Sequence, residues 1–119
     1  MGGYGRLREW LAEVVAPRLG ERLPGSADLL VVWNNHANIA PELKGMRTPL
    51  CSATSHGNGA TWQSIKTLES AANGWYCYTA MEFTADNAVL LGYCAGDNQV
   101  GGLNRLRITR IPLGWLSQN

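Results

Sequence analysis

The segment Ser55-His56-Gly57-Asn58-Gly59-Ala60-Thr61-Trp62 constrains the fold of this chain more than any other stretch. It places small and turn-forming residues between two predicted strands. A serine side chain can bond nearby backbone groups, and glycine adopts positive φ angles at little steric cost. We therefore expect a tight turn between two neighbouring strands at this point.

The chain after position 26 has the pattern of an all-β, mainly antiparallel protein. Leu29–Trp33 is a short apolar run bounded by turn residues, which is typical of a buried strand. Residues 34–46, with two Asn, a His, a Pro and a Gly, predict an irregular loop. Turn signals separate five further predicted strands, at 48–54, 60–66, 75–83, 88–94 and 104–111.

One amphipathic helix is predicted over residues 5–22. Apolar residues recur there at helical spacing and form one stripe: Leu7, Trp10, Leu11, Val14 and Val15. Pro17 should end or kink this helix because it removes a backbone donor. The mixed charges favour a helix packed on the protein over a membrane-surface helix. We divide the chain into a helix and linker over 1–26 and a β region over 27–119.

The composition excludes several classes of protein. With 45% hydrophobic and 16% charged residues the 119-residue chain is globular, and its net charge of +1 gives no case for nucleic acid or anionic membranes. It has no apolar run of about 18 residues, and its charged N-terminus does not resemble a signal peptide, so we expect a cytoplasmic protein. The two histidines and the three cysteines (Cys51, Cys77 and Cys94) lack metal-ligand spacing. We expect no metal or cofactor, and buried free thiols.

The segment Ser55–Trp62 lies close to S-x-D-x-G-x-T-W, the Asp-box of sialidase (neuraminidase) superfamily β-propellers. Four other pieces stand in the order of that family: Leu29–Asn34, Arg47–Leu50, Trp75–Ala80 and Val89–Tyr93. Residues 27–116 thus resemble about two blades of a six-bladed propeller. The resemblance assigns the turn to Ser55, Asn58, Gly59, Thr61 and Trp62, with Trp62 packed beneath the blade. Gly57 stands where the pattern has Asp, so we expect a looser turn in which Asn58 replaces part of the bonding.

The resemblance also implies a site for an acidic sugar. In that family an arginine before an Asp-box helps to clamp the sialic acid carboxylate, and a tyrosine after it is the nucleophile. Arg47 and Tyr78 occupy these positions. The phenol needs a nearby base, but no residue matches the family's glutamate, its acid/base aspartate or its first arginine. Glu82 lies about 13 Å from Tyr78 along a straight strand. We expect no hydrolysis by the isolated chain.

Strand parity assigns the remaining candidates. Tyr76 and Tyr78 share one parity, so we predict that they face a cleft, and that the opposite face forms core with Cys77, Thr79, Met81 and Phe83. Asn34, after a buried strand, is a further candidate ligand. For the tyrosines and Asn34, packing or hydrogen bonding within the protein is the alternative. Near the C-terminus the parity predicts a solvated basic face with Arg105 and Arg107, opposite Leu106 and Ile108.

Three functions follow as hypotheses. The first is a truncated sialidase-like propeller segment that binds acidic sugars such as sialic acid without hydrolysing them alone. The second is a small β-rich structural or assembly protein without a glycan ligand. The third is a sialidase completed by oligomerisation. Open blades leave unpaired edges and uncovered faces, so we expect a homo-oligomer.

Overall fold

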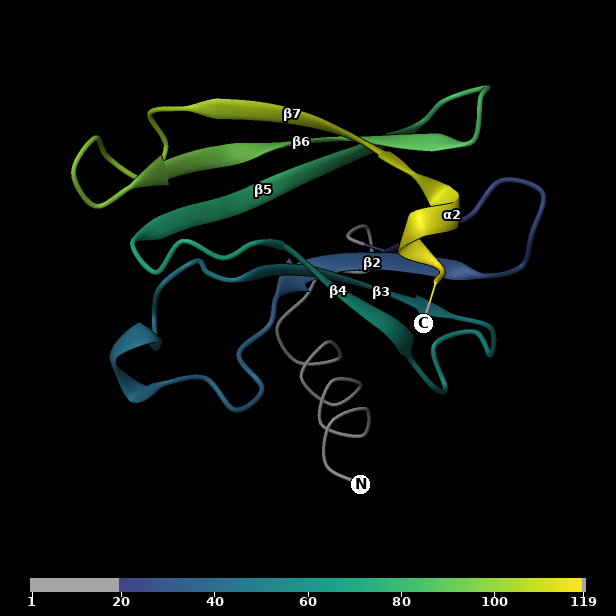
Figure 1. Ribbon diagram of the computed structural model, residues 1–119, viewed down its shortest axis with the longest axis horizontal. Helices are drawn as coiled ribbons and strands as arrows, with labels where there is room; N and C mark the ends of the chain where they lie inside the picture. The colour runs from purple at the N-terminus through teal and green to yellow at the C-terminus, as the bar shows by residue number, and fades with distance from the viewer. Residues whose placement is uncertain (1–19, 119) are drawn as a thin grey trace.

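The computed structural model describes residues 20–118, which form two antiparallel sheets (Figure 1). Sheet A has the strand order β1-β2-β3-β4, and sheet B has the order β5-β6-β7. The strands of sheet A are β1 (Gly20–Arg22), β2 (Leu29–Asn34), β3 (Leu50–Ser55) and β4 (Gln63–Glu69). Those of sheet B are β5 (Gly74–Phe83), β6 (Ala88–Asp97) and β7 (Leu106–Pro112). The mainly antiparallel all-β prediction is confirmed, and each strand predicted after position 26 is present.

The predicted helix over 5–22 is wrong at its C-terminal end. Gly20–Arg22 form β1 and pair antiparallel with Leu29–Val31 of β2. The edge of β2 offers unpaired backbone groups to this segment, whereas a helix continuing past Pro17 would lose a hydrogen bond. The rest of the predicted helix lies outside the described residues. Within 20–118 the helical elements are short: the 3-10 turn η2 (Pro41–Leu43) and the helix α2 (Leu113–Leu116).

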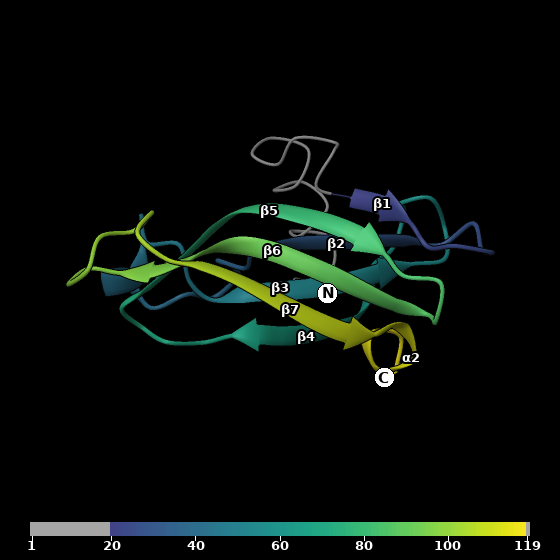
Figure 2. The ribbon, with the colours of Figure 1, turned by 90° about the horizontal axis from the view of Figure 1, so that it is seen from above.

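The two sheets pack face to face, with their strands running in roughly the same direction (Figure 2). One side of sheet A contributes Leu30, Val32 and Leu50 to the core between them. Sheet B contributes Tyr76, Val89, Leu91, Tyr93, Ala95 and Ile111. Leu116 of α2 is 1% exposed and closes one end of this core.

Sheet A is buried on its other side as well. Val31, Trp33, Cys51, Ala53 and Trp62 form a second buried cluster there. Every residue of β3 is buried, whereas buried and half-buried positions largely alternate along β6. Sheet A is therefore a two-sided layer, and sheet B is covered on one side.

The turn between β3 and β4 contains the segment Ser55–Trp62, which resembles an Asp-box. The buried hydroxyl of Ser55 accepts hydrogen bonds from the backbone amides of Gly57 and Gly59, at 3.3 and 2.8 Å. Asn58 and Gly59 both adopt positive φ angles, of 55° and 87°. Trp62 is 8% exposed and joins the second cluster. The turn is thus held by Ser55 and by backbone conformation.

A polar cluster joins the two sheets at the β4 and β7 edges. The hydroxyl of Tyr93 donates to a carboxylate oxygen of Glu69 at 2.6 Å and lies 2.9 Å from the hydroxyl of Thr109. Arg107 donates to the same oxygen of Glu69. Because Arg107 pairs with Tyr93 in the sheet, its side chain lies on the inner face. Arg105 and Arg107 are both exposed, as predicted, but Arg107 also binds Glu69 of the other sheet. The opposite positions Leu106 and Ile108 are exposed as well, at 74% and 67%.

Candidate functional site

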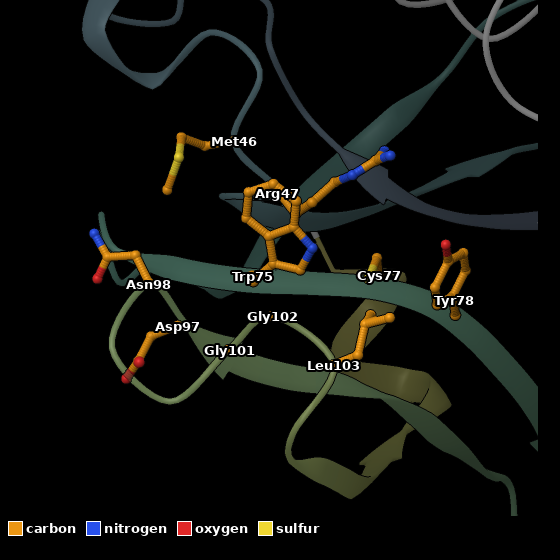
Figure 3. Close-up of a pocket in the computed structure, with 10 residues that line it drawn as sticks. All are labelled: Met46, Arg47, Trp75, Cys77, Tyr78, Asp97, Asn98, Gly101, Gly102 and Leu103. Carbon is orange, nitrogen blue, oxygen red and sulfur yellow. The ribbon is translucent and has the colours of Figure 1, made fainter.

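An open pocket of about 570 Å³ lies beside the first half of β5 (Figure 3). Three segments that are distant in the sequence form it. Met46 and Arg47 precede β3, and Trp75, Cys77 and Tyr78 belong to β5. The loop after β6 adds Asp97, Asn98, Gly101, Gly102 and Leu103. The structure thus brings Arg47 and Tyr78, the two residues selected by the family resemblance, to one pocket.

The backbone of Arg47 is fixed against the start of β5. Its carbonyl accepts a hydrogen bond from the amide of Tyr76 at 2.8 Å, and the residue forms a parallel bridge with Trp75. The next residue, Thr48, is buried and donates to the carbonyl of Ala71 at 2.8 Å. The arginine side chain itself is exposed. Within residues 20–118 the ion pairs are made by other residues, so the guanidinium of Arg47 has no carboxylate partner there.

Tyr78 stands at a β-bulge in the middle of β5. Cys77 pairs with Cys94 and Ala80 with Gly92, so Tyr78 and Thr79 together lie opposite Tyr93. Tyr78 has a φ of 56° and is 74% exposed. A positive φ at a bulky residue costs about 1–3 kcal/mol, and such strain is concentrated at functional sites. The tyrosine is held in the pocket by the bulge and not by burial.

The bulge overturns the predicted parity of β5. Tyr76 and Tyr78 do not share a face: Tyr76 is 5% exposed in the core, and Tyr78 faces solvent. Met81 and Phe83 pack against the same core as Tyr76, whereas Cys77 lies on the outer face. One extra residue in a strand reverses the side on which all later residues fall.

The structure brings neither Tyr76 nor Asn34 to the pocket. The ring of Tyr76 packs edge-to-face on Tyr93, with 6.3 Å between centroids. The side-chain amide of Asn34 donates to the carbonyls of Tyr76, at 3.0 Å, and Pro49, at 3.4 Å. Asn34 thereby ties the end of β2 to β5. Tyr76 therefore packs inside the protein and Asn34 bonds inside it, which is the alternative to ligand binding stated for both residues from the sequence.

Tyr78 has no general base among the described residues that line the pocket. Asp97 is the one carboxylate there, and its Oδ1 accepts the amides of Gln99 and Val100, each at 2.8 Å. The hydrogen bonds from Val100 and Gln99 lower the pKa of Asp97, so this group is ionised at neutral pH. In Figure 3 the Asp97 carboxylate lies at one end of the pocket, and the guanidinium of Arg47 and the hydroxyl of Tyr78 lie toward the other.

Sequence reasoning missed the wall of the pocket formed by the loop after β6. Gly102 packs against Trp75 so closely that a Cβ atom at Gly102 would lie 2.4 Å from the indole ring. Gly101 has a φ of 98°, and Asn104 donates its backbone amide to the Gly101 carbonyl at 3.3 Å. The Gly101-Gly102 pair was the available signal, but its contact with Trp75 depends on tertiary packing that no local pattern reports.

The turn Ser55–Trp62 lies away from this pocket. Arg47 precedes β3 and Ser55 ends it, so the turn is at the opposite end of a strand of six residues, about 20 Å long. Ser55, Asn58, Gly59 and Trp62 therefore act on the fold and do not contact a ligand in the pocket. Thr61 is exposed in the same turn.

Within residues 20–118, no group of three or more His, Cys, Asp or Glu side chains is arranged to hold a metal ion. In the same range no helix is both long and apolar enough to cross a membrane. Comparison with protein-family models, with curated proteins and with solved structures finds no match to this chain.

Proposed function

We propose that this chain is a two-blade, sialidase-like propeller segment that binds an acidic sugar without hydrolysing it alone. The observation that carries this proposal is the convergence of Arg47 and Tyr78 on one open pocket. The family resemblance that points to these two residues rests on the sequence alone and is independent of the pocket. Their meeting from separate segments favours a ligand site over two unrelated surface residues.

The chemistry of the pocket suits a sugar carboxylate. A planar guanidinium makes paired, charge-assisted hydrogen bonds to a carboxylate, and Arg47 is exposed without an ion-pair partner among the described residues. The phenol of Tyr78 can donate a further hydrogen bond, and the indole of Trp75 supplies an apolar wall. Hydrolysis by a tyrosine nucleophile also needs a base, and the Asp97 carboxylate is engaged by the amides of its own turn.

Titration calorimetry with sialic acid tests this proposal. We expect binding by the unaltered chain and an affinity reduced about 10- to 100-fold in Arg47→Ala, because a hydrogen bond to a charged group contributes about 1.5–3 kcal/mol. Arg110→Ala is the matched control, since Arg110 is an exposed arginine paired with Asp86 outside the pocket. Equal affinities in the two variants would contradict the proposed site, as would equally tight binding of a neutral hexose.

A second candidate function, assembly, rests on the outer face of sheet B. Leu103, Leu106 and Ile108 are 62%, 74% and 67% exposed, and β7 is an open edge strand. Exposed apolar patches and unpaired edges mark interaction surfaces. We infer self-association through this face, as neighbouring blades pack in a propeller. Light scattering should give an oligomer for the unaltered chain and a monomer for Ile108→Asp, and a monomeric unaltered chain at micromolar concentration contradicts the inference.

Oligomerisation is also the route to the third candidate, a complete sialidase. A second copy would have to supply the base and the missing arginines. A fluorogenic sialoside tests this directly, with Tyr78→Phe as the decisive variant. Hydrolysis that persists in Tyr78→Phe would exclude the tyrosine mechanism, and hydrolysis lost in both Tyr78→Phe and Ile108→Asp would favour a site shared between copies.

A further inference from the structure

Two of the three cysteines stand directly opposite each other in sheet B. Cys77 of β5 pairs with Cys94 of β6, immediately before the bulge at Tyr78. The neighbouring pair, Tyr76 and Ala95, does not bond across the β5–β6 ladder. The amide of Tyr76 donates to the carbonyl of Arg47, and the amide of Ala95 donates to the carbonyl of Arg105. Cys77 and Cys94 therefore point their own backbone groups at one another and form a hydrogen-bonded pair of the ladder.

This register places the two thiols within reach of a covalent bond. Residues in a hydrogen-bonded antiparallel pair have Cα atoms about 5.5 Å apart, and disulfides span about 4.4–6.8 Å between Cα atoms. Both side chains lie on the outer face of sheet B, directly opposite each other in the ladder. The Cα spacing of this pair is therefore within the range that a disulfide spans.

The two thiols differ in burial, and this difference decides which of them reacts first. Cys77 is 9% exposed and lines the pocket, whereas Cys94 is half-buried. Burial raises the pKa of Cys77, and the neighbouring Cys94 raises it further, while the charge of Arg47 opposes them. The more accessible Cys94 is therefore the thiol that meets a reagent first, with Cys77 beside it as the resolving thiol.

We propose that Cys77 and Cys94 form a reactive cross-strand dithiol that closes to a disulfide on reaction with a small-molecule disulfide such as oxidised glutathione. The thiolate of Cys94 attacks one sulfur of the reagent, forms a mixed disulfide and releases one molecule of glutathione. The thiolate of Cys77 then attacks Sγ of Cys94 and releases the second glutathione. The two cysteine protons leave to water or to the released thiolates. Overall, one reagent disulfide is reduced and one protein disulfide is formed.

Intact mass and thiol counting test this on the folded full chain, in dilute solution where no second copy covers the outer face of sheet B. After exposure to oxidised glutathione and removal of the reagent, we expect the reactive thiols counted in denaturant to fall from three to one, with a mass loss of two hydrogens. Peptide mapping of the unaltered chain should join the Cys77 peptide to the Cys94 peptide. This last measurement needs no variant, so it holds whether or not a cysteine substitution disturbs folding.

Cys51 provides a matched control. It is 2% exposed in the second cluster of sheet A and lies against Thr67, with 3.8 Å between its sulfur and the hydroxyl. Cys51→Ser should still close the bond, with thiols falling from two to none. Cys94→Ser should form no intramolecular bond and should keep its far-ultraviolet circular dichroism. The proposal is overturned if three thiols persist in the treated chain, if Cys51 enters the bond, or if only disulfide-linked dimers form.

Discussion

Sheets A and B both carry apolar residues on their outer faces but differ in the burial of those residues. On sheet A the outer positions Val31, Trp33 and Cys51 are at most 3% exposed. On sheet B the outer positions Leu106 and Ile108 are more than 65% exposed. An antiparallel sheet with one solvated face normally carries polar residues on that face. Sheet B thus exposes large apolar residues of β7 on its uncovered side, and this supports the proposed assembly.

The largest expected contrast comes from truncating one outer-face residue on each sheet. Trp33→Ala should lower the free energy of unfolding by about 3–5 kcal/mol, as in a core, whereas Ile108→Ala should change it by less than about 0.5 kcal/mol in the monomer. Urea unfolding followed by circular dichroism measures both. Equal losses of unfolding free energy in dilute solution would contradict the proposed difference in burial between the outer faces of the two sheets. A loss for Ile108→Ala that grows with protein concentration would show that a second copy covers sheet B.

The next contrast concerns the polar cluster that joins the sheets. Burial, followed by the hydrogen bond to Glu69, raises the pKa of Tyr93 to about 12. An unfolded tyrosine ionises near pH 10, so the fold favours the neutral phenol and gains stability below that pH. This stability should be lost as the pH rises from about 10 to about 12.

Tyr93→Phe should remove much of that alkaline loss. At neutral pH the variant should be less stable by about 1.5–3 kcal/mol, because the Glu69 carboxylate loses a hydrogen bond. Unfolding curves at pH 8, 10 and 11 compare the two chains. Tyr76 also has a raised pKa, caused first by burial, so a residual slope is expected in the variant. Parallel pH profiles for both chains would contradict this account of Tyr93.

A smaller effect should separate the turn Ser55–Trp62 from the pocket. Ser55→Ala leaves the amides of Gly57 and Gly59 without their buried acceptor and should cost about 1–2 kcal/mol of stability. Because Ser55 and Arg47 flank opposite ends of β3, the affinity for sialic acid should stay within about twofold of the unaltered chain. Urea unfolding and calorimetry measure the two quantities on one sample. A binding loss as large as that of Arg47→Ala would mean that the turn shapes the pocket.

The two sheets also differ in how far the sequence predicted them. Apolar runs and turn residues located the strands after position 26, because these signals are local. The faces of β5 were assigned wrongly because the bulge at Tyr78 lacks the glycine that usually marks a positive φ. The ion pair of Arg107 with Glu69 was not predicted, because Glu69 lies on the other sheet and far away in the sequence. Arg47 and Tyr78 were selected through a family resemblance, whereas the Gly102 wall depends on contact between distant segments.

The smallest expected effect on stability compares two bulges, one in each sheet. Ser64 in β4 and Tyr78 in β5 have φ angles of 55° and 56°. Ser64 is 8% exposed and donates its hydroxyl to the carbonyl of Ser117 at 3.2 Å, whereas Tyr78 is 74% exposed. Tyr78→Gly relieves the strained φ, and the greater flexibility of unfolded glycine offsets part of the gain. We expect a change between zero and about 1 kcal/mol of stabilisation.

Ser64→Gly relieves the same strain but removes the bond to Ser117, so it should destabilise the protein by about 1 kcal/mol. Urea unfolding measures the stability of the two variants, and titration of Tyr78→Gly with sialic acid measures its affinity for the ligand. Unchanged or increased stability with lost binding in Tyr78→Gly would mean that the strained tyrosine serves the ligand. A clear loss of stability in Tyr78→Gly would instead mean that its ring supports the fold, and the case for a ligand would then depend on Arg47 alone.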